Sequence, residues 1–319
     1  IIMSINNTLL DRTNYYSLYS GKNYSVQLGA IESGSLVFTG KSLTLSARVT
    51  ITNPSLHHEI LDIDGVKIGY LAYVEFLSGE NGIFLPELDN IFGEFKNAGI
   101  TELIVDLRYN PGGDIGAVRH LASGIAPFSV TLNSEILVKL NYNNGLQRYL
   151  EDNNYSDYLS YKFKTVASNV NLSRVFVLTT NRSASASELL IIGLKPYMNV
   201  VQIGDTTYGK YAGSWVIPDD GEKWAMMPIV MKFSNTQGFT DFEKGLFPDH
   251  VIEDDPVGAP PFGDPSDPMV AKAIELATGT SIPTKKAKMA DMPKLKQLYP
   301  EEMAIKRSLI INRLEQIIK

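Results

Sequence analysis

Three serines at alternate positions stand between a predicted strand and a predicted helix. Ser183, Ser185 and Ser187 lie in TTNRSASASELLIIGL, residues 179–194. Unpaired backbone N–H groups at a helix N-terminus, together with the helix dipole, favour negative charge. A nucleophile at Ser185 would find there the environment that an acyl-transfer oxyanion needs. The pattern also fits a plain helix N-cap at Ser183 or Ser185, with Glu188 completing a capping box from Ser185.

A serine nucleophile needs a base, and the chain offers a lysine or a histidine. Lys210 lies on a glycine-bounded turn, IGDTTYGKYAGS (203–214), directly after an apolar strand. A lysine acts as a general base only when it is neutral, so burial must lower its pKa. His250 has acidic neighbours in PDHVIEDD, which keeps a histidine-dependent hydrolase as a third candidate function. The other histidines fit surface or packing roles: His57, His58 and His120.

A glycine-rich turn follows another apolar strand, in LIVDLRYNPGGD (103–114). Gly112 and Gly113 would allow backbone N–H groups to approach a bound group closely. The alternative is an ordinary turn between a strand and a helix. The chain has no G-x-S-x-G motif, which weakens an α/β-hydrolase interpretation, and no S-x-x-K motif of the penicillin-binding type.

The elements around these residues alternate between strand-like and helix-like patterns. Such alternation predicts α/β units with partly parallel pairing. Residues 219–221 are expected at the tip of a hairpin, and 145–173 are expected to be irregular with one short helix. The predicted strands are 67–76, one within 101–113 that ends at the Pro-Gly-Gly turn, 134–144, 174–180 and 200–205. The predicted helices are 85–100, 117–126, 186–198 and one that starts at 269.

The composition excludes several classes of protein. The chain has 319 residues with a net charge of -6, which argues against nucleic acid as the main partner. It contains no cysteine, so disulfides and thiolate chemistry are excluded. No apolar stretch reaches about 18 residues, so we expect no membrane span. The opening residues lack a secretory-signal pattern, and we expect the natural start to lie upstream.

Together the motifs resemble the carboxyl-terminal processing peptidases, also called tail-specific proteases. The resemblance rests on LIVDLRYNPGGD, on NRSASASELL with a lysine 25 residues after its middle serine, and on KGLFPDHVIEDD. It covers about residues 57–279. It implies a crotonase-like (ClpP/crotonase-type) α/β catalytic domain and a serine endopeptidase that cuts in the C-terminal regions of proteins.

The resemblance assigns a role to each motif. Ser185 is the expected nucleophile and Lys210 the general base of a Ser–Lys dyad, which works through an acyl-enzyme. Backbone N–H groups of Ala186 and of Gly112 or Gly113 are the expected oxyanion donors. No cofactor or metal is implied, and the expected partner is a peptide or protein with an unstructured C-terminus.

The lysine motif departs from the family pattern. Members often continue it as Gly-Lys-Gly and carry a glutamine four residues after the lysine. Here Tyr211 follows Lys210, and Ser214, a shorter side chain, stands at the glutamine position as the candidate that orients the lysine. This departure keeps open a second function, a non-catalytic protein that binds peptides or hydrophobic ligands on the same scaffold.

The resemblance also suggests three parts of the chain. Residues 1–50 carry short β-type runs and are expected to be the C-terminal part of a truncated PDZ-like domain, with a simple β module as the alternative. Residues 51–279 form the expected catalytic domain, and 280–319 a helical tail. Since such proteases act outside the cytoplasm in bacteria, we expect a location in the cell envelope, periplasmic or lipid-anchored.

Overall fold

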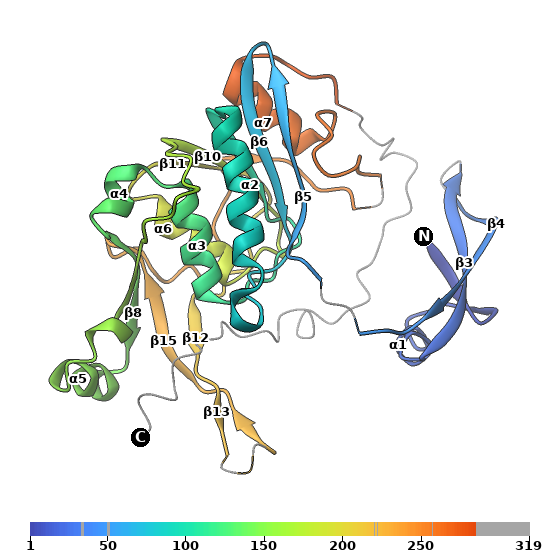
Figure 1. Ribbon diagram of the computed structural model, residues 1–319. Helices are drawn as coiled ribbons and strands as arrows, with labels where there is room; N and C mark the ends of the chain where they lie inside the picture. The colour runs from blue at the N-terminus through green and yellow to red at the C-terminus, as the bar shows by residue number, and fades with distance from the viewer. Residues whose placement is uncertain (33–34, 50–51, 220, 222, 257, 285–319) are drawn as a thin grey trace. The chain divides into compact units, whose positions relative to one another are not determined.

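The computed structural model describes residues 1–284, apart from 33–34, 50–51, 220, 222 and 257 (Figure 1). Within these residues the chain forms two compact units, which divide after residue 52. The helical tail predicted for 280–319 lies outside the described residues from 285 onward.

The first unit is a small antiparallel sheet with one short helix. The strands follow the order β2-β1-β3-β4, and β3 and β4 form a long hairpin. Ile5 and Val26 are its buried apolar side chains. The sequence predicted this β-rich character, but not the full length of the hairpin. The elements are β1 (Ile2–Ile5), β2 (Thr8–Leu9), α1 (Tyr15–Tyr19), β3 (Asn23–Glu32) and β4 (Ser35–Ser46).

A six-stranded sheet forms the centre of the second unit. Its order is β16-β11-β10-β7-β6-β5, and every neighbouring pair is parallel except β5 with β6. The central strands are buried on both faces, which is why they consist of nearly continuous apolar residues. The strands are β5 (Ser55–Ile63), β6 (Val66–Tyr73), β7 (Glu102–Asp106), β10 (Arg174–Thr179), β11 (Asn199–Gly204) and β16 (His250–Val251).

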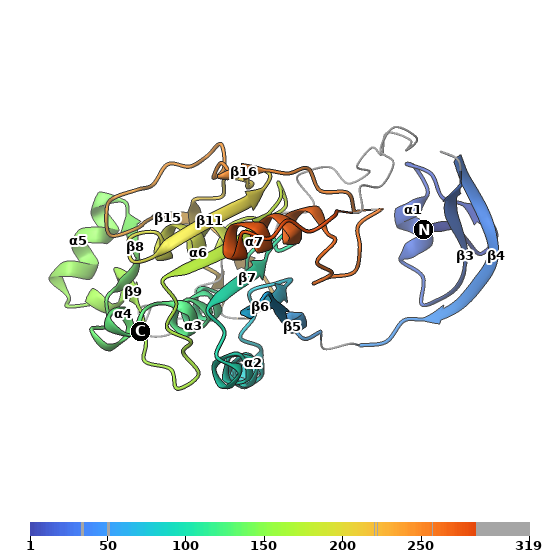
Figure 2. The same ribbon diagram turned by 90° about the horizontal axis from the view of Figure 1, so that it is seen from above.

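Helices cover both faces of this sheet, as the view from above shows (Figure 2). Helices α2, α3 and α6 share one apolar core with one face, and α7 packs on the other. Two shorter helices, α4 and α5, flank β8. The helices are α2 (Leu85–Ala98), α3 (Ile115–Ile125), α4 (Phe128–Leu132), α5 (Asn144–Asp152), α6 (Ala186–Leu194) and α7 (Pro268–Thr278). Short 3-10 turns occupy Glu80–Gly82 and Ser156–Tyr158.

A second, antiparallel sheet lies beside the first and has the order β12-β15-β8-β9. From it projects the β13–β14 hairpin, which confirms the hairpin predicted around residues 219–221 (Figure 1). The strands are β8 (Ile136–Tyr142), β9 (Ser160–Lys162), β12 (Ala212–Ser214), β13 (Ile217–Pro218), β14 (Ala225–Met226) and β15 (Ile229–Ser234).

The predicted α/β class is confirmed, but strands β5, β9 and β16 and helix α4 were not predicted. Strand β5, which carries His57 and His58, was not predicted, since its apolar residues are interrupted by charged and polar ones. None of the helices among the described residues is long and apolar enough to cross a membrane.

Candidate active site

The candidate residues lie on loops that follow three neighbouring parallel strands. The register pairs Asp106 of β7 with Leu178 of β10, and Thr179 of β10 with Gly204 of β11. Carboxyl ends of adjacent parallel strands meet at one edge of a sheet, where ligands of open α/β sheets commonly bind. The glycine turn, the serine segment and the lysine turn therefore leave the sheet at the same edge.

Ser185 stands at the N-cap of α6 in a conformation that side-chain-bearing residues rarely adopt. Its φ is 57° and its ψ is -109°, and such strain persists where the surroundings fix it, often at functional sites. The residue is fully buried. Its Oγ makes no hydrogen bond to any residue in the described part of the chain, Lys210 included. The hydroxyl therefore makes no capping hydrogen bond, whereas Glu188 accepts the backbone N–H of Ser185 as in a capping box.

The carboxylate of Glu188 joins the serine segment to the lysine turn. Its Oε2 accepts the backbone N–H of Ser185 at 2.7 Å and that of Lys210 at 2.9 Å. Its Oε1 accepts the Thr207 hydroxyl at 2.6 Å and the Gly209 N–H at 2.7 Å. Because both nitrogens donate to the same oxygen atom, the backbones of Ser185 and Lys210 lie close together. The sequence suggested only a capping box for Glu188, and nothing in the pattern indicated the bond to the lysine turn.

Burial changes the proton affinity of both ionisable groups. Desolvation lowers the pKa of Lys210, and the negative charge of Glu188 opposes that effect. Desolvation raises the pKa of Glu188, against the hydrogen bonds it accepts. A lowered lysine pKa increases the fraction of neutral amine, the form that can accept a proton.

The glycine turn packs directly against Ser185. A Cβ on Gly112 would lie 2.7 Å from the Cβ of Ser185, and one on Gly113 would lie 2.1 Å from the carbonyl oxygen of Phe76. Their φ angles are 107° and 138°, so both space and backbone conformation require glycine. The N–H of Gly112 donates to the side-chain Oδ1 of Asn110 at 2.9 Å.

The two flanking serines fix the nucleophile segment to the loop after β7. The hydroxyl of Ser183 donates to the carbonyl of Leu107 at 2.7 Å, and that of Ser187 donates to the carbonyl of Asn110 at 2.9 Å. Both side chains are fully buried. Their hydrogen bonds hold the segment on both sides of Ser185 against the loop after β7.

A buried ion network supports the base of the glycine turn. Arg108 donates to Asp106, at 2.7 Å from Nη2, and to Asp267, at 2.8 Å from Nη1, with Asp254 at 3.3 Å. Asp267 also caps α7 by accepting the N–H groups of residues 269 and 270. The network thus connects the segment before the turn to a helix on the opposite face of the sheet.

The other candidate residues lie elsewhere or have other partners. Ser214 is buried in β12 next to β15. Three histidines contact carboxylates, namely His57 with Glu59, His58 with Glu94 and His120 with Asp89, and His250 pairs with Ile203 in the sheet. No histidine bonds to Ser185 among the described residues. The same residues hold no cluster of histidine and carboxylate groups that could bind a metal.

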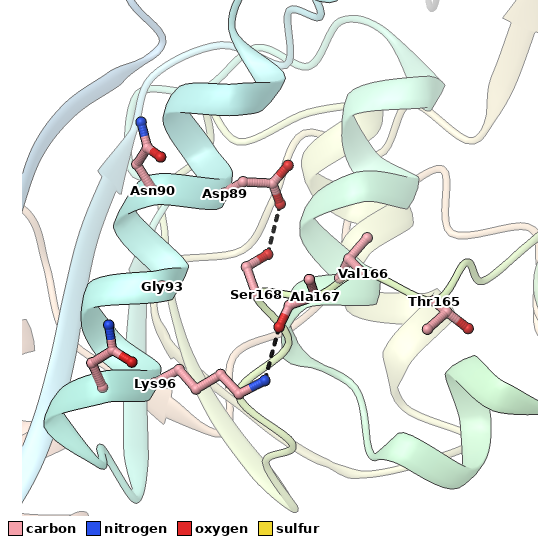
Figure 3. A pocket seen from close by; sticks show the side chains of 9 residues that line it. Asp89, Asn90, Gly93, Lys96, Thr165, Val166, Ala167 and Ser168 are labelled. Carbon is pink, nitrogen blue, oxygen red and sulfur yellow. Dashed lines mark hydrogen bonds between the residues drawn. The ribbon is translucent and has the colours of Figure 1, made fainter.

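A surface cavity of about 660 Å³ lies apart from these residues, between α2 and the segment 165–168 (Figure 3). Both charged side chains that line the cavity, Asp89 and Lys96, form hydrogen bonds with other residues that line it. Asp89 accepts the hydroxyl of Ser168 at 2.6 Å, and Lys96 donates to the carbonyl of Ala167 at 2.8 Å. No candidate catalytic residue lines it.

The profile of peptidase family S41 matches residues 67–252, more than half of the chain. The chain belongs to peptidase family S41. Carboxyl-terminal-processing protease of Picosynechococcus sp. is 25% identical over 234 residues, which are 72% of this chain and 50% of that protein. Carboxyl-terminal-processing peptidase 2, chloroplastic, of Arabidopsis thaliana is 26% identical over 263 residues, which are 79% of this chain and 45% of that protein.

The crystal structure of an S41-type protein from Bacteroides fragilis shares the fold of this S41 chain. The TM-score is 0.74 at 26% identity, and the alignment covers 87% of this chain and 72% of that one. The matched range 67–252 contains the glycine turn, Ser185 and Lys210. The predicted family is thereby confirmed, while the chain spans about half the length of the curated relatives that it matches.

Proposed function

We propose that this S41 chain is a serine endopeptidase with Ser185 as nucleophile and Lys210 as general base. The observation that carries the proposal is the shared carboxylate oxygen of Glu188, which brings the backbones of the two residues together. The buried, pKa-lowered amine of Lys210 supports it further, because a neutral amine can take the serine proton.

In the proposed reaction, Ser185 Oγ attacks the carbonyl carbon of a peptide while its proton passes to Lys210. The tetrahedral intermediate collapses to an acyl-enzyme as the protonated lysine supplies the proton that leaves with the amine. Water, deprotonated by Lys210, then attacks the ester and releases the new C-terminus. Each proton taken by the lysine is returned, and no cofactor takes part.

For the oxyanion hole we propose the backbone N–H groups of Gly113 and Ala186. Both flank the place where a carbonyl on Ser185 would sit, since Gly112 contacts Ser185 and Ala186 begins α6. The N–H of Gly112 is less suited, because it already donates to Asn110. Backbone donors at a helix N-terminus stabilise the negative charge that develops in acyl transfer.

The proposed reaction needs a rearrangement first. Proton transfer requires the lysine nitrogen within about 3.2 Å of the serine oxygen, or joined to it through one water, and no hydrogen bond between them is formed here. Ser185 is also fully buried. We propose that substrate binding opens the site and brings the Lys210 amine to Ser185; catalytic hydrogen bonds often tighten only in the substrate complex.

The missing hydrogen bond between Ser185 and Lys210 and the burial of Ser185 also favour a second candidate, a protein that binds peptides or hydrophobic ligands without cleaving them. Ser214 at the position of the usual glutamine is consistent with it, because the shorter side chain reaches less far toward Lys210. The crotonase-like classification, the PDZ-like nature of residues 1–50 and the location in the cell envelope remain proposals based on the family.

Turnover of an unstructured peptide separates the two functions. We expect the chain to cleave such a peptide and its Ser185→Ala variant to bind without cleaving. Binding of the peptide by both proteins, with no product from either, would favour the non-catalytic function.

A further inference from the structure

Asn110 is a fully buried residue that performs no step of the proposed reaction. Its side chain joins two segments. Nδ2 donates to the carbonyl of Tyr73, at the end of β6, at 2.8 Å, and Oδ1 accepts the N–H of Gly112 at 2.9 Å. One N–H of Nδ2 is thus used by Tyr73, and the Oδ1 acceptor is used by Gly112.

The backbone of Asn110 reaches a third segment, the one that carries the nucleophile. Its carbonyl accepts the N–H of Ala184 at 3.2 Å and the hydroxyl of Ser187 at 2.9 Å. These donors flank Ser185 on either side. One residue therefore ties the end of β6, the glycine turn and the start of α6 together.

We propose that Asn110 is the positioning residue of the oxyanion hole, an inference that rests on the proposed function. Its Oδ1 holds the N–H of Gly112 and so fixes the peptide group before that residue. The N–H of Phe76 donates to the carbonyl of Gly112 at 2.9 Å and fixes the next peptide group, whose N–H belongs to Gly113. Two consecutive glycines have wide backbone freedom, so the turn needs the Asn110 side chain on one side in addition to the Phe76 backbone on the other. Oxyanion donors act only when they are already aimed at the developing charge.

The test compares two substitutions at Asn110 with a matched one elsewhere. Asn169 is also a buried asparagine, and its Nδ2 donates to the carbonyls of Ser123 and Ala126 at 2.6 and 2.8 Å. We expect Asn110→Ala to lower kcat on an unstructured peptide by about 10²-fold with little change in KM, the loss typical of a misplaced catalytic group. Asn169→Ala should lower the thermal midpoint while kcat of the folded protein stays near the wild-type value.

Asn110→Asp separates positioning from a general loss of stability. It keeps the acceptor for Gly112 but loses the bond to Tyr73 and buries a carboxylate. Its thermal midpoint should be no higher than that of Asn110→Ala, yet amide hydrogen exchange of residues 112–114 should stay closer to that of the wild type, because the acceptor for Gly112 is kept. Amide hydrogen exchange of residues 112–114 should increase in Asn110→Ala but not in Asn169→Ala.

The results can contradict either the positioning role of Asn110 or the proposed peptidase function on which that role rests. If Asn110→Ala keeps wild-type kcat, or if kcat merely follows the thermal midpoint across the three variants, the positioning role is wrong. If the wild-type chain itself shows no Ser185-dependent turnover, the proposed function fails and this inference with it. The wild-type control therefore distinguishes the two failures.

Discussion

The backbone N–H groups of Ser185 and Lys210 donate to one and the same atom, Oε2 of Glu188, at 2.7 and 2.9 Å. The two residues are 25 positions apart in sequence and lie on loops after different strands. Their relative position therefore depends on a carboxylate with two further donors on its other oxygen. This arrangement makes Glu188 a sensitive point of the site.

Replacing Glu188 by glutamine should impair both stability and activity. An amide cannot accept all four hydrogen bonds, because its NH₂ group faces at least one N–H donor. We expect the free energy of unfolding to fall by about 1–3 kcal/mol and kcat to fall by about 10²-fold. Urea unfolding and peptide turnover measure the two effects. Glu102→Gln, which removes an ion pair with Arg174, is the control and should leave kcat unchanged.

Replacing Gly112 by alanine should eliminate activity. The added methyl would lie 2.7 Å from the Cβ of Ser185, in addition to the strain of a positive φ, about 1–3 kcal/mol. Gly238→Ala separates the two causes, because Gly238 has a φ of +80° and open space around it. Both variants should lose stability in thermal unfolding, but only Gly112→Ala should lose turnover. Equal activity of the two variants would contradict the close packing on Ser185.

The pKa of Lys210 predicts the pH dependence of activity. Because burial lowers that pKa, kcat/KM should rise with pH with a midpoint below that of a solvent-exposed lysine. Lys210→Arg should be inactive throughout, since a guanidinium does not give up its proton. A pH profile from 5 to about 10 for both proteins tests this. A rising limb that survives in Lys210→Arg would assign the titration to another group.

The lowered pKa of Lys210 also predicts how the stability of the fold depends on pH. The unfolded chain binds the Lys210 proton more tightly than the folded chain does. The free energy of unfolding should therefore increase with pH between the lowered pKa and the ordinary lysine pKa. In Lys210→Met this increase should be absent, which denaturant unfolding at a series of pH values would measure.

Arg108 should matter for folding more than for chemistry. Replacing it by methionine leaves Asp106 and Asp267 buried without a counter-charge. Removing one partner of a buried ion pair costs about 3–5 kcal/mol, so we expect a large drop in the thermal midpoint. Lys232→Met breaks an exposed pair with Asp241 and should change the midpoint little. Equal effects of the two substitutions would contradict a supporting role for the network.

The sequence predicted the sheet better than it predicted the site. The strand and helix patterns from 67 to 205 were sufficient for the α/β class, because the buried parallel strands have apolar centres and alternate with helices of apolar periodicity. Strand β5 was missed, since its pattern resembles an exposed edge.

The contacts within the site depend on residues that are distant in sequence. Ser185 and Lys210 were singled out by their motifs, whereas Glu188 was predicted only as a local cap and Asn110 was given no role. The partners of these two residues are distant in sequence: Gly209 lies on the loop after β11, and Tyr73 lies at the end of β6. Hydrogen bonds between loops of different strands leave no periodic signal along the chain, so the pattern could not reveal them.

Peptide turnover by the full chain, compared with its Ser185→Ala and Lys210→Ala variants, tests the central claim most directly. The proposal predicts that the wild-type chain cleaves an unstructured peptide. Each variant should lose at least about 10³-fold in kcat while keeping the circular dichroism spectrum and thermal midpoint of a folded protein. Cleavage at wild-type rate by either folded variant would contradict the Ser185–Lys210 dyad.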